Sequence, residues 1–271
     1  MSTVELRLAA LVCYPIKSCR GMSVEVAAVE QRGLAKDRLM MVVDEDGQFV
    51  SQRSAPSLAL IAPALAEDVL TLRAPNMPEL SIQVHHQGAR RRVRVWNDTC
   101  EAVDQGEAVA DWLSHYLGQR VRLVRLADDC VRRVDPRYAV TDHDEVSFAD
   151  GYPCLVTTQA SLDALNARLS RPIPMDRFRP NLVIAGNHAF EEDTWAEIAV
   201  GDVRLALVKP CSRCTVITID QSTGQGDPEP LRALESFRRR DGKVMFGQNA
   251  IVLNTGVVRV GDPVRVLQRK L

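Results

Sequence analysis

The sequence predicts a mainly β protein built in two parts. Short runs with alternating polarity or β-branched residues recur along the chain, as is typical of a barrel or a sandwich. Turn residues separate several of these runs, and only a few segments have a helical pattern. The runs are Val4 to Val12, Val24 to Val29, Leu39 to Val43, Val69 to Leu72, Val121 to Leu126, Leu182 to Ile184, Val203 to Val208, Thr215 to Ile219, Ala250 to Leu253 and Val264 to Leu267.

Turn signals predict hairpins between some of these runs. Asp46-Gly47 separates Leu39 to Val43 from Gln48 to Ser51, and Gly201-Asp202 lies between two further strand-like runs. Gly261-Asp262-Pro263 precedes the last run. Glycine and aspartate favour the tight turns that join antiparallel strands, so we expect a hairpin at each of these places.

Two segments have the spacing of amphipathic helices. Glu107 to Leu117 repeats apolar residues at every fourth position, and Gly118 follows as a helix stop. Ser161 to Leu169 repeats leucine at spacings of three and four, after Thr157-Thr158, whose hydroxyls suit an N-cap. Between these helices, Ala127 to Ala149 is rich in Asp and Arg without periodicity, which predicts a connection between two lobes.

Composition limits the classes of protein. With 271 residues, 46% hydrophobic and 25% charged, the chain is long enough for a packed globular core. The formal net charge of -1 argues against a dedicated nucleic-acid binder or acidic-membrane binder, and Arg90 to Val95 alternates like a strand with one basic, solvated face. The N-terminus lacks a secretion signal, and no run approaches the roughly 18 apolar residues of a membrane span, so we expect a cytoplasmic location.

The chemistry centres on Cys211 and Cys214, two of seven cysteines. An odd number of cysteines without a secretion signal argues against a disulfide framework. Four interpretations remain open. A zinc site would need two further closely spaced ligands, which the sequence lacks, and a redox pair normally opens a helix, whereas a β-pattern follows Cys214. The other two are a single thiolate ligand flanked by Lys209 and Arg213, and a pair of buried structural thiols.

Two other segments carry basic side chains in turn-like sequence. Tyr14-Pro15-Ile16-Lys17-Ser18-Cys19-Arg20-Gly21 follows a strand-like run and offers a cation, a hydroxyl and backbone N–H groups to an anion. Met175-Asp176-Arg177-Phe178-Arg179-Pro180-Asn181 brings forked guanidinium groups that suit phosphate or pterin binding. Taken alone, the first segment is more typical of a plain surface turn, and the second is equally compatible with a rim of solvated arginines.

Together these segments resemble a MOSC domain preceded by its partner, the MOSC N-terminal β-barrel domain. The resemblance rests on Cys211-Ser212-Arg213-Cys214, on Arg177 to Asn181 and on the two N-terminal motifs, Tyr14 to Gly21 and Lys36-Asp37-Arg38. Phe246-Gly247-Gln248-Asn249 and Val260 to Val264 follow near the C-terminus, so the segments resemble those of the family in the order in which it carries them. The resemblance implies a β-barrel-like domain over residues 1–127 and a MOSC β-barrel domain with a few short helices over residues 128–271.

The resemblance also implies a molybdenum–molybdopterin cofactor (Mo-MPT). In the family the second cysteine of the Cys-Ser-Arg-Cys segment binds the metal, which makes Cys214 the metal ligand and catalytic residue here, with Cys211 in a supporting role. At Gly151, Tyr152 and Asn249 the animal members carry other side chains. The implied cofactor-binding residues are Lys17, Ser18, Arg38, Gly151, Tyr152, Arg179, Asn181, Ser212, Arg213 and Asn249.

The function that the resemblance implies is reduction of N-hydroxylated compounds, N–OH to N–H plus water. The sequence lacks the cysteine spacing of a fused iron–sulfur domain, so we expect an external electron donor, ferredoxin-like or a flavoprotein. Phe237 to Lys243 forms an expected solvated loop that offers an acidic redox protein a docking surface. The alternatives are a carrier of cofactor or persulfide sulfur, which needs no electron donor, and a β-rich binding module with structural cysteines.

Overall fold

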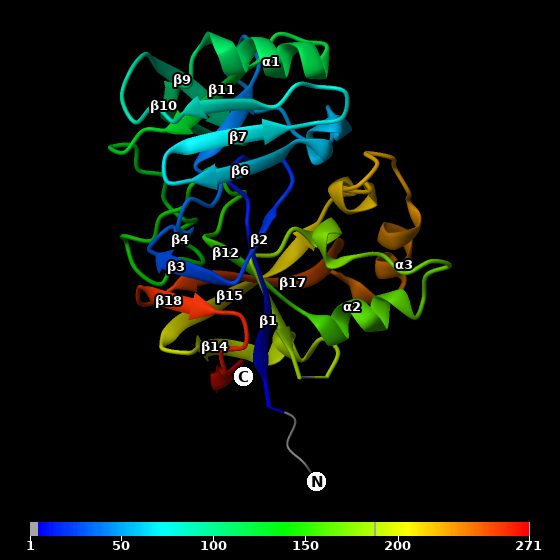
Figure 1. Cartoon of the computed structure of the whole chain (residues 1–271). Coiled ribbons are helices and arrows are strands. Elements are labelled where there is room, and N and C mark those ends of the chain that lie inside the picture. The colour runs from blue at the N-terminus through cyan, green and yellow to red at the C-terminus, as the bar shows by residue number, and fades with distance from the viewer. Residues whose placement is uncertain (1–4, 187, 271) are drawn as a thin grey trace.

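The computed structural model describes residues 5–186 and 188–270, and the predicted mainly β fold is confirmed. In Figure 1 the strands β6, β7 and β9 to β11 lie with helix α1 in an upper lobe, and the remaining labelled strands lie with α2 and α3 in a lower lobe. The first predicted strand begins within the part of the chain that the structure describes, at Arg7, and Val4 lies outside it.

The lower lobe contains the largest sheet, with nine strands among residues 5–186 and 188–270, in the order β19-β14-β15-β17-β12-β13-β1-β2, with β16 paired to β17. The N-terminal strand of the chain, β1, belongs to this sheet and pairs with β13, with Leu11 opposite Leu182. The strands are β1 (Arg7–Cys13), β2 (Met22–Val24), β12 (Cys154–Thr158), β13 (Leu182–Ala185), β14 (Trp195–Val200), β15 (Val203–Arg213), β16 (Arg239–Arg240), β17 (Lys243–Val252) and β19 (Val264–Arg269).

Three smaller sheets complete the described part of the chain. A four-stranded sheet in the upper lobe has the order β5 (Met40–Val43), β11 (Arg122–Leu126), β10 (Asp98–Asp104) and β9 (Arg90–Val95). A second sheet joins β18 (Gly256–Arg259), β3 (Val26–Glu30) and β4 (Gly33–Leu34). The third is formed by β6 (Ala62–Ala66), β7 (Val69–Arg73) and β8 (Leu80–Gln83).

Both predicted helices are confirmed, and a third follows later in the described sequence. These are α1 (Glu107–Leu117), α2 (Gln159–Asn166) and α3 (Glu229–Arg238). Helix α1 ends at Gly118 in the left-handed conformation, and Thr158 caps α2 by accepting a hydrogen bond from the Ser161 N–H. Short 3₁₀ turns are η1 (Pro56–Leu60), η2 (Met175–Phe178), η3 (Glu191–Thr194) and η4 (Thr215–Thr218).

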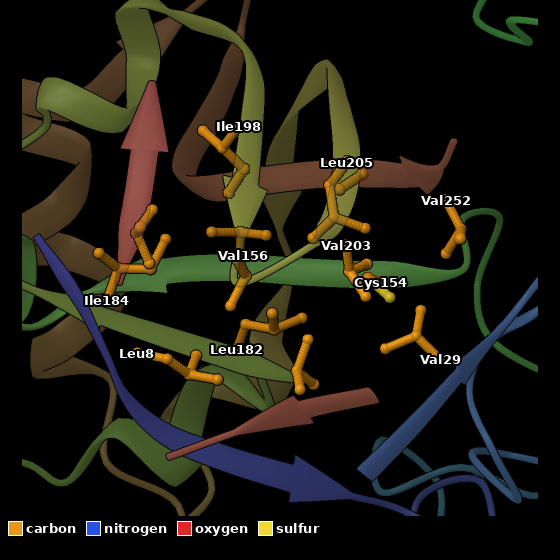
Figure 2. Packing of buried hydrophobic residues seen from close by; sticks show 14 of the residues in the cluster. Leu8, Val29, Cys154, Val156, Leu182, Ile184, Ile198, Val203, Leu205 and Val252 are labelled. Carbon is orange, nitrogen blue, oxygen red and sulfur yellow. The ribbon is translucent and has the colours of Figure 1, made fainter. Parts of the chain in front are cut away.

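Alternating apolar residues of the large sheet form its main core. Figure 2 shows Leu8, Val156, Leu182 and Leu205 from four different strands packed together, and each is fully or almost fully buried. Burying one such side chain contributes roughly 1.5–3 kcal/mol. Because β1 supplies Leu8 to this core, the N-terminal segment that follows β1 is held at a fixed place against the lower lobe.

Two of the three predicted hairpins are confirmed. Residues Asp46 and Gly47 lie in a turn that the Gly47 N–H to Asp44 carbonyl bond closes, and Val200 pairs with Val203 across Gly201-Asp202. The hairpin predicted at Gly261-Asp262-Pro263 is wrong. The strands on either side of this turn pair elsewhere, β18 with β3 and β19 with β14, so the turn connects two different sheets.

The strand predicted for Thr215 to Ile219 is also wrong, because Thr215–Thr218 forms the 3₁₀ turn η4. The turn buries Ile217 among Phe178, Leu234 and Phe246 of a separate core cluster, while its two neighbours are half-buried. Two side chains stabilise it: Thr218 Oγ1 donates to the Thr215 carbonyl, and the Arg177 guanidinium donates to the Thr218 carbonyl. The strand that the sequence analysis used as an argument against a redox pair is therefore not formed.

The basic segments are solvated only in part: residues 239–243 are exposed as predicted, whereas two arginines are buried. Phe237 to Lys243 is not a loop, since it contains the end of α3, the strand β16 and the start of β17. Arg238 is buried and forms an ion pair with Asp193 at 2.7 Å. Arg177 is likewise buried, 2.9 Å from Asp220. The predicted strand around Arg90 to Val95 is confirmed, with exposed arginines and buried Val93 and Val95.

Candidate functional site

One cavity of about 430 Å³ is lined by all the site residues predicted from the sequence, and also by Cys211 and Lys209. Residues from both lobes line it. The selected residues on its wall are Lys17, Ser18, Arg38, Gly151, Tyr152, Arg179, Asn181, Ser212, Arg213, Cys214 and Asn249. The cavity therefore unites segments that are separated by more than half of the sequence.

The N-terminal part of the wall is held by backbone bonds to β5. The Lys17 N–H donates to the Met40 carbonyl at 2.8 Å, and the Arg38 N–H donates to the Tyr14 carbonyl at 2.6 Å. Ser18 and Arg38 both have positive φ angles, 70° and 49°. Such angles are uncommon for residues with a Cβ, and they persist where surrounding contacts enforce them, often at functional sites.

Arg38 and Arg179 form the basic floor of the cavity. The Arg38 guanidinium donates to Asp37 at 2.5 Å, to Asn181 Oδ1 at 3.1 Å and to the Arg179 carbonyl at 3.0 Å. Arg179 also has a left-handed backbone, with φ 55°, and its Nη1 donates to the Cys19 carbonyl at 2.7 Å. Burial lowers the pKa of Arg179, although the guanidinium remains charged.

The cysteine pair lies at the end of β15, where a register shift next to Pro210 and Ser212 interrupts pairing with β17. Cys214 is exposed on the cavity wall, and Cys211 is half-buried. Arg213 connects this segment to the floor, because its Nη1 lies 2.9 Å from Cys211 Sγ and its Nη2 donates to the Phe178 carbonyl at 2.8 Å. The guanidinium thus lies beside the half-buried thiol of Cys211, while the thiol of Cys214 is accessible.

Two buried N–H groups of the cavity have no partner among the described residues: Arg179 Nη2 and Arg213 Nε. Unpaired buried donors are rare in folded proteins, since each costs roughly 1–3 kcal/mol. Both belong to permanently charged side chains that line the same cavity. The donor set fits an anionic group such as a phosphate, and Cys214 adds a soft sulfur ligand for a metal.

A second group of wall residues was missed by the sequence analysis. Asp150 accepts from Lys17 Nζ at 2.5 Å and from Trp96 Nε1 at 3.1 Å. Burial lowers the pKa of Lys17, while the adjacent carboxylate opposes this shift. Desolvation acts to raise the pKa of Asp150, but the charge and hydrogen bond of Lys17 outweigh it and hold this pKa below its usual range.

Trp96 is the residue of this group with a detectable sequence signal. It follows the arginine-rich strand β9 at a hairpin turn, has a φ angle of 56° and is 41% exposed. Its ring contacts Phe49 edge to face at 4.8 Å and lies 4.4 Å from the Arg53 guanidinium. An exposed aromatic side chain in a strained turn at a cavity wall suits contact with a ligand.

The remaining predicted residues also line the cavity. Tyr152 contacts Tyr138 edge to face, and Lys209 Nζ lies 4.2 Å from the Tyr138 ring centroid. Asn249 of β17 pairs with Leu155 of β12, and Gly151 has no neighbour close to where a Cβ would stand. Besides the Lys209 ammonium, these positions offer aromatic surface and open backbone.

Two other kinds of feature are absent from the described residues. Among residues 5–186 and 188–270, no group of three or more His, Cys, Asp or Glu side chains has the arrangement of a metal site. Within the same ranges, no helix is both long and apolar enough to span a bilayer. The zinc interpretation of the cysteine pair therefore has no support from the described side chains.

Two family models match the chain. The MOSC N-terminal beta barrel domain matches residues 5–120, and the MOSC domain matches residues 143–265. Mitochondrial amidoxime-reducing component 1 of Mus musculus is 37% identical over 278 residues, which covers 96% of this chain and 82% of the mouse protein. The chain belongs to the MOSC-domain family of the amidoxime-reducing components.

Further relatives of this MOSC-domain protein have similar coverage. The Homo sapiens component 1 is 36% identical over 96% of this chain and 82% of its own length, and the Rattus norvegicus component 2 is 36% identical over 93% and 80%. These relatives are mitochondrial by name, and a cytoplasmic location for this chain stays a prediction. The predicted domain boundary near residue 128 falls between the two family matches and also stays a prediction.

Proposed function

We propose that this MOSC-domain protein reduces N-hydroxylated compounds with a molybdenum–molybdopterin cofactor bound in the cavity. The reaction takes N–OH, two electrons and two protons to N–H and water. The observation that carries the proposal is the convergence of one exposed thiol, Cys214, with two buried guanidinium donors that lack partners. Membership of the amidoxime-reducing family supports the choice of substrate.

The chain's residues divide into two groups around the proposed cofactor. Arg38, Arg179 and Arg213 line the cavity and would hold the phosphate of the cofactor with their positive charges, and the last two each have one N–H without a partner among the described residues. Cys214 provides the sulfur ligand for the metal. When bound, the cofactor supplies the two-electron chemistry, so the protein's part is to hold it and to orient the substrate.

The wall formed by Lys17, Asp150 and Trp96 supports the substrate side of the proposal. Lys17 Nζ and Trp96 Nε1 both donate to Asp150 Oδ1, which fixes the carboxylate, and its second oxygen forms no hydrogen bond with any described residue. That oxygen accepts an N–H of an amidine-like substrate. Trp96 and Tyr152 give this end of the cavity apolar surface for the rest of the molecule.

The experiment is a turnover assay on protein expressed in a host that makes the cofactor. An amidoxime and a chemically reduced viologen are supplied, and formation of the amidine is measured. We expect turnover by the wild type and none by Cys214→Ser or by protein from a cofactor-deficient host. Cofactor-loaded protein that never forms amidine would contradict the reductase and favour a carrier of cofactor or sulfur.

The electrons must come from a separate partner in this proposal. Two electrons are consumed for each N–OH bond that is reduced, and the described residues contain no cluster of metal-ligating side chains for a second redox centre. A flavoprotein or ferredoxin-like donor has the required chemistry. Replacing the viologen by such a protein with its reductase, and measuring the same amidine product, tests this part separately.

A further inference from the structure

Tyr14 lies between the two arginines of the cavity floor. The guanidinium carbons of Arg38 and Arg179 are each 4.3 Å from the centroid of its ring. The ring is 2% exposed, so these contacts are shielded from water. Both guanidiniums therefore contact the same aromatic ring.

The ring compensates for repulsion between two like charges. An aromatic face carries partial negative charge and attracts a cation, most strongly where both are desolvated. Arg38 also has the Asp37 carboxylate at 2.5 Å, whereas Arg179 forms no ion pair with any described residue. The Tyr14 ring and the Cys19 carbonyl therefore hold the Arg179 guanidinium in place.

The phenol hydroxyl takes no part in this arrangement. Tyr14 Oη is buried and has no hydrogen-bond partner among the described residues, and burial raises the pKa of Tyr14 to about 12. The ring edge is fixed instead by Gly21: a Cβ there would lie 2.6 Å from Tyr14 Cε1 and 2.5 Å from Val12 Cγ1. The glycine that closes the N-terminal motif therefore leaves room for the ring.

We propose that Tyr14 is a positioning residue whose ring fixes the separation and orientation of the Arg38 and Arg179 guanidiniums for the anionic group of the ligand. Arg179 keeps Nη2 unpaired because the ring and the Cys19 carbonyl hold the rest of its guanidinium. The inference rests on the proposed function for the identity of the ligand, a pterin phosphate. The arrangement of the two arginines does not depend on that identity.

The test compares variants that change the ring, the hydroxyl or only the ring's charge distribution. Tyr14→Phe removes the unpaired hydroxyl, and Tyr14→Leu removes the aromatic face. A third series places phenylalanine with one, two or three fluorine atoms at position 14, which keeps the shape and weakens the attraction for cations. The readouts are pterin content per protein after expression in a cofactor-competent host and the dissociation constant for inorganic phosphate of the cofactor-free protein.

We expect Tyr14→Phe to match the wild type in both readouts. Tyr14→Leu is expected to bind phosphate about tenfold more weakly, and phosphate affinity should fall stepwise with fluorination while each fluorinated variant keeps a cooperative urea unfolding transition. Equal phosphate affinity and pterin content across the fluorinated series would overturn the positioning role, even if Tyr14→Leu fails to fold. Wild-type protein that holds neither pterin nor phosphate would instead overturn the proposed cofactor site, and with it the ligand assigned here.

Discussion

The carboxylate of Asp37 stabilises the basic floor of the cavity, and Asp37→Asn removes its charge with little change in shape. The side chain is completely buried, accepts from the Tyr14 N–H at 2.8 Å and pairs with Arg38, whose side chain is 12% exposed. Asparagine still accepts from the backbone N–H, so the loss is that of the ion pair. Removing one partner of a buried pair costs about 3–5 kcal/mol, because it leaves the other charge uncompensated.

We expect the lower end of this range, about 3 kcal/mol, because Arg38 keeps its bonds to Asn181 and to the Arg179 carbonyl. The assay is urea unfolding at pH 7 of cofactor-free protein without phosphate. Asp135→Asn is the matched control: it breaks an exposed pair with Arg137 and should cost under about 0.5 kcal/mol.

A double-mutant cycle with Arg38→Met separates the pair from its surroundings. If the charges interact as described, the double variant loses less stability than the two single variants together. Strict additivity, or a loss for Asp37→Asn as small as that of the control, would refute the reasoning. Added phosphate should stabilise cofactor-free Asp37→Asn protein, because the anion then supplies the missing negative charge.

Two further predictions concern stability. Desolvation acts to raise the pKa of Asp104, but hydrogen bonds from Arg122 and the Gly106 N–H outweigh it and lower this pKa to about 2. Asp104→Asn should therefore lose about 2 kcal/mol of unfolding free energy at pH 7, measured by urea unfolding. This contribution is complete above the ordinary carboxyl pKa near 4 and disappears as pH falls through about 2; a difference that does not shrink between pH 5 and pH 3 contradicts it. Gly21→Ala should cost about 1–3 kcal/mol in the same assay, because its Cβ overlaps the Tyr14 ring, and an unchanged midpoint would contradict that overlap.

Local patterns predicted the elements whose hydrophobic period and end signals agree. Helix α1 has the predicted bounds because apolar spacing and Gly118 specify the same segment. Thr215 to Ile219 carries β-branched residues, yet burial of Ile217 and the hydrogen bonds from Arg177 favour a 3₁₀ turn. The turn at Gly261 has ordinary hairpin chemistry, and the sequence does not specify that its flanking strands pair with β3 and β14.

The candidate site was predictable where family motifs identify charged or sulfur-bearing residues. Asp150 and Trp96 were missed because neither belongs to a motif, and only the folded chain brings them to Lys17. The position of Tyr14 between two arginines was equally hidden, since Arg38 and Arg179 are far apart in sequence. Left-handed backbone at residues with a Cβ has no simple sequence signature, although it shapes the cavity floor.

The most direct test of the account is the molybdenum-to-protein ratio of the wild type and Cys214→Ala, each expressed in a host that makes the cofactor. We predict near-stoichiometric metal in the wild type and a much lower ratio in the variant, with Cys211→Ala as the control that retains metal. The absence of both metal and pterin from the wild type, or an unchanged ratio in Cys214→Ala, would contradict the assignment of Cys214 as the metal ligand.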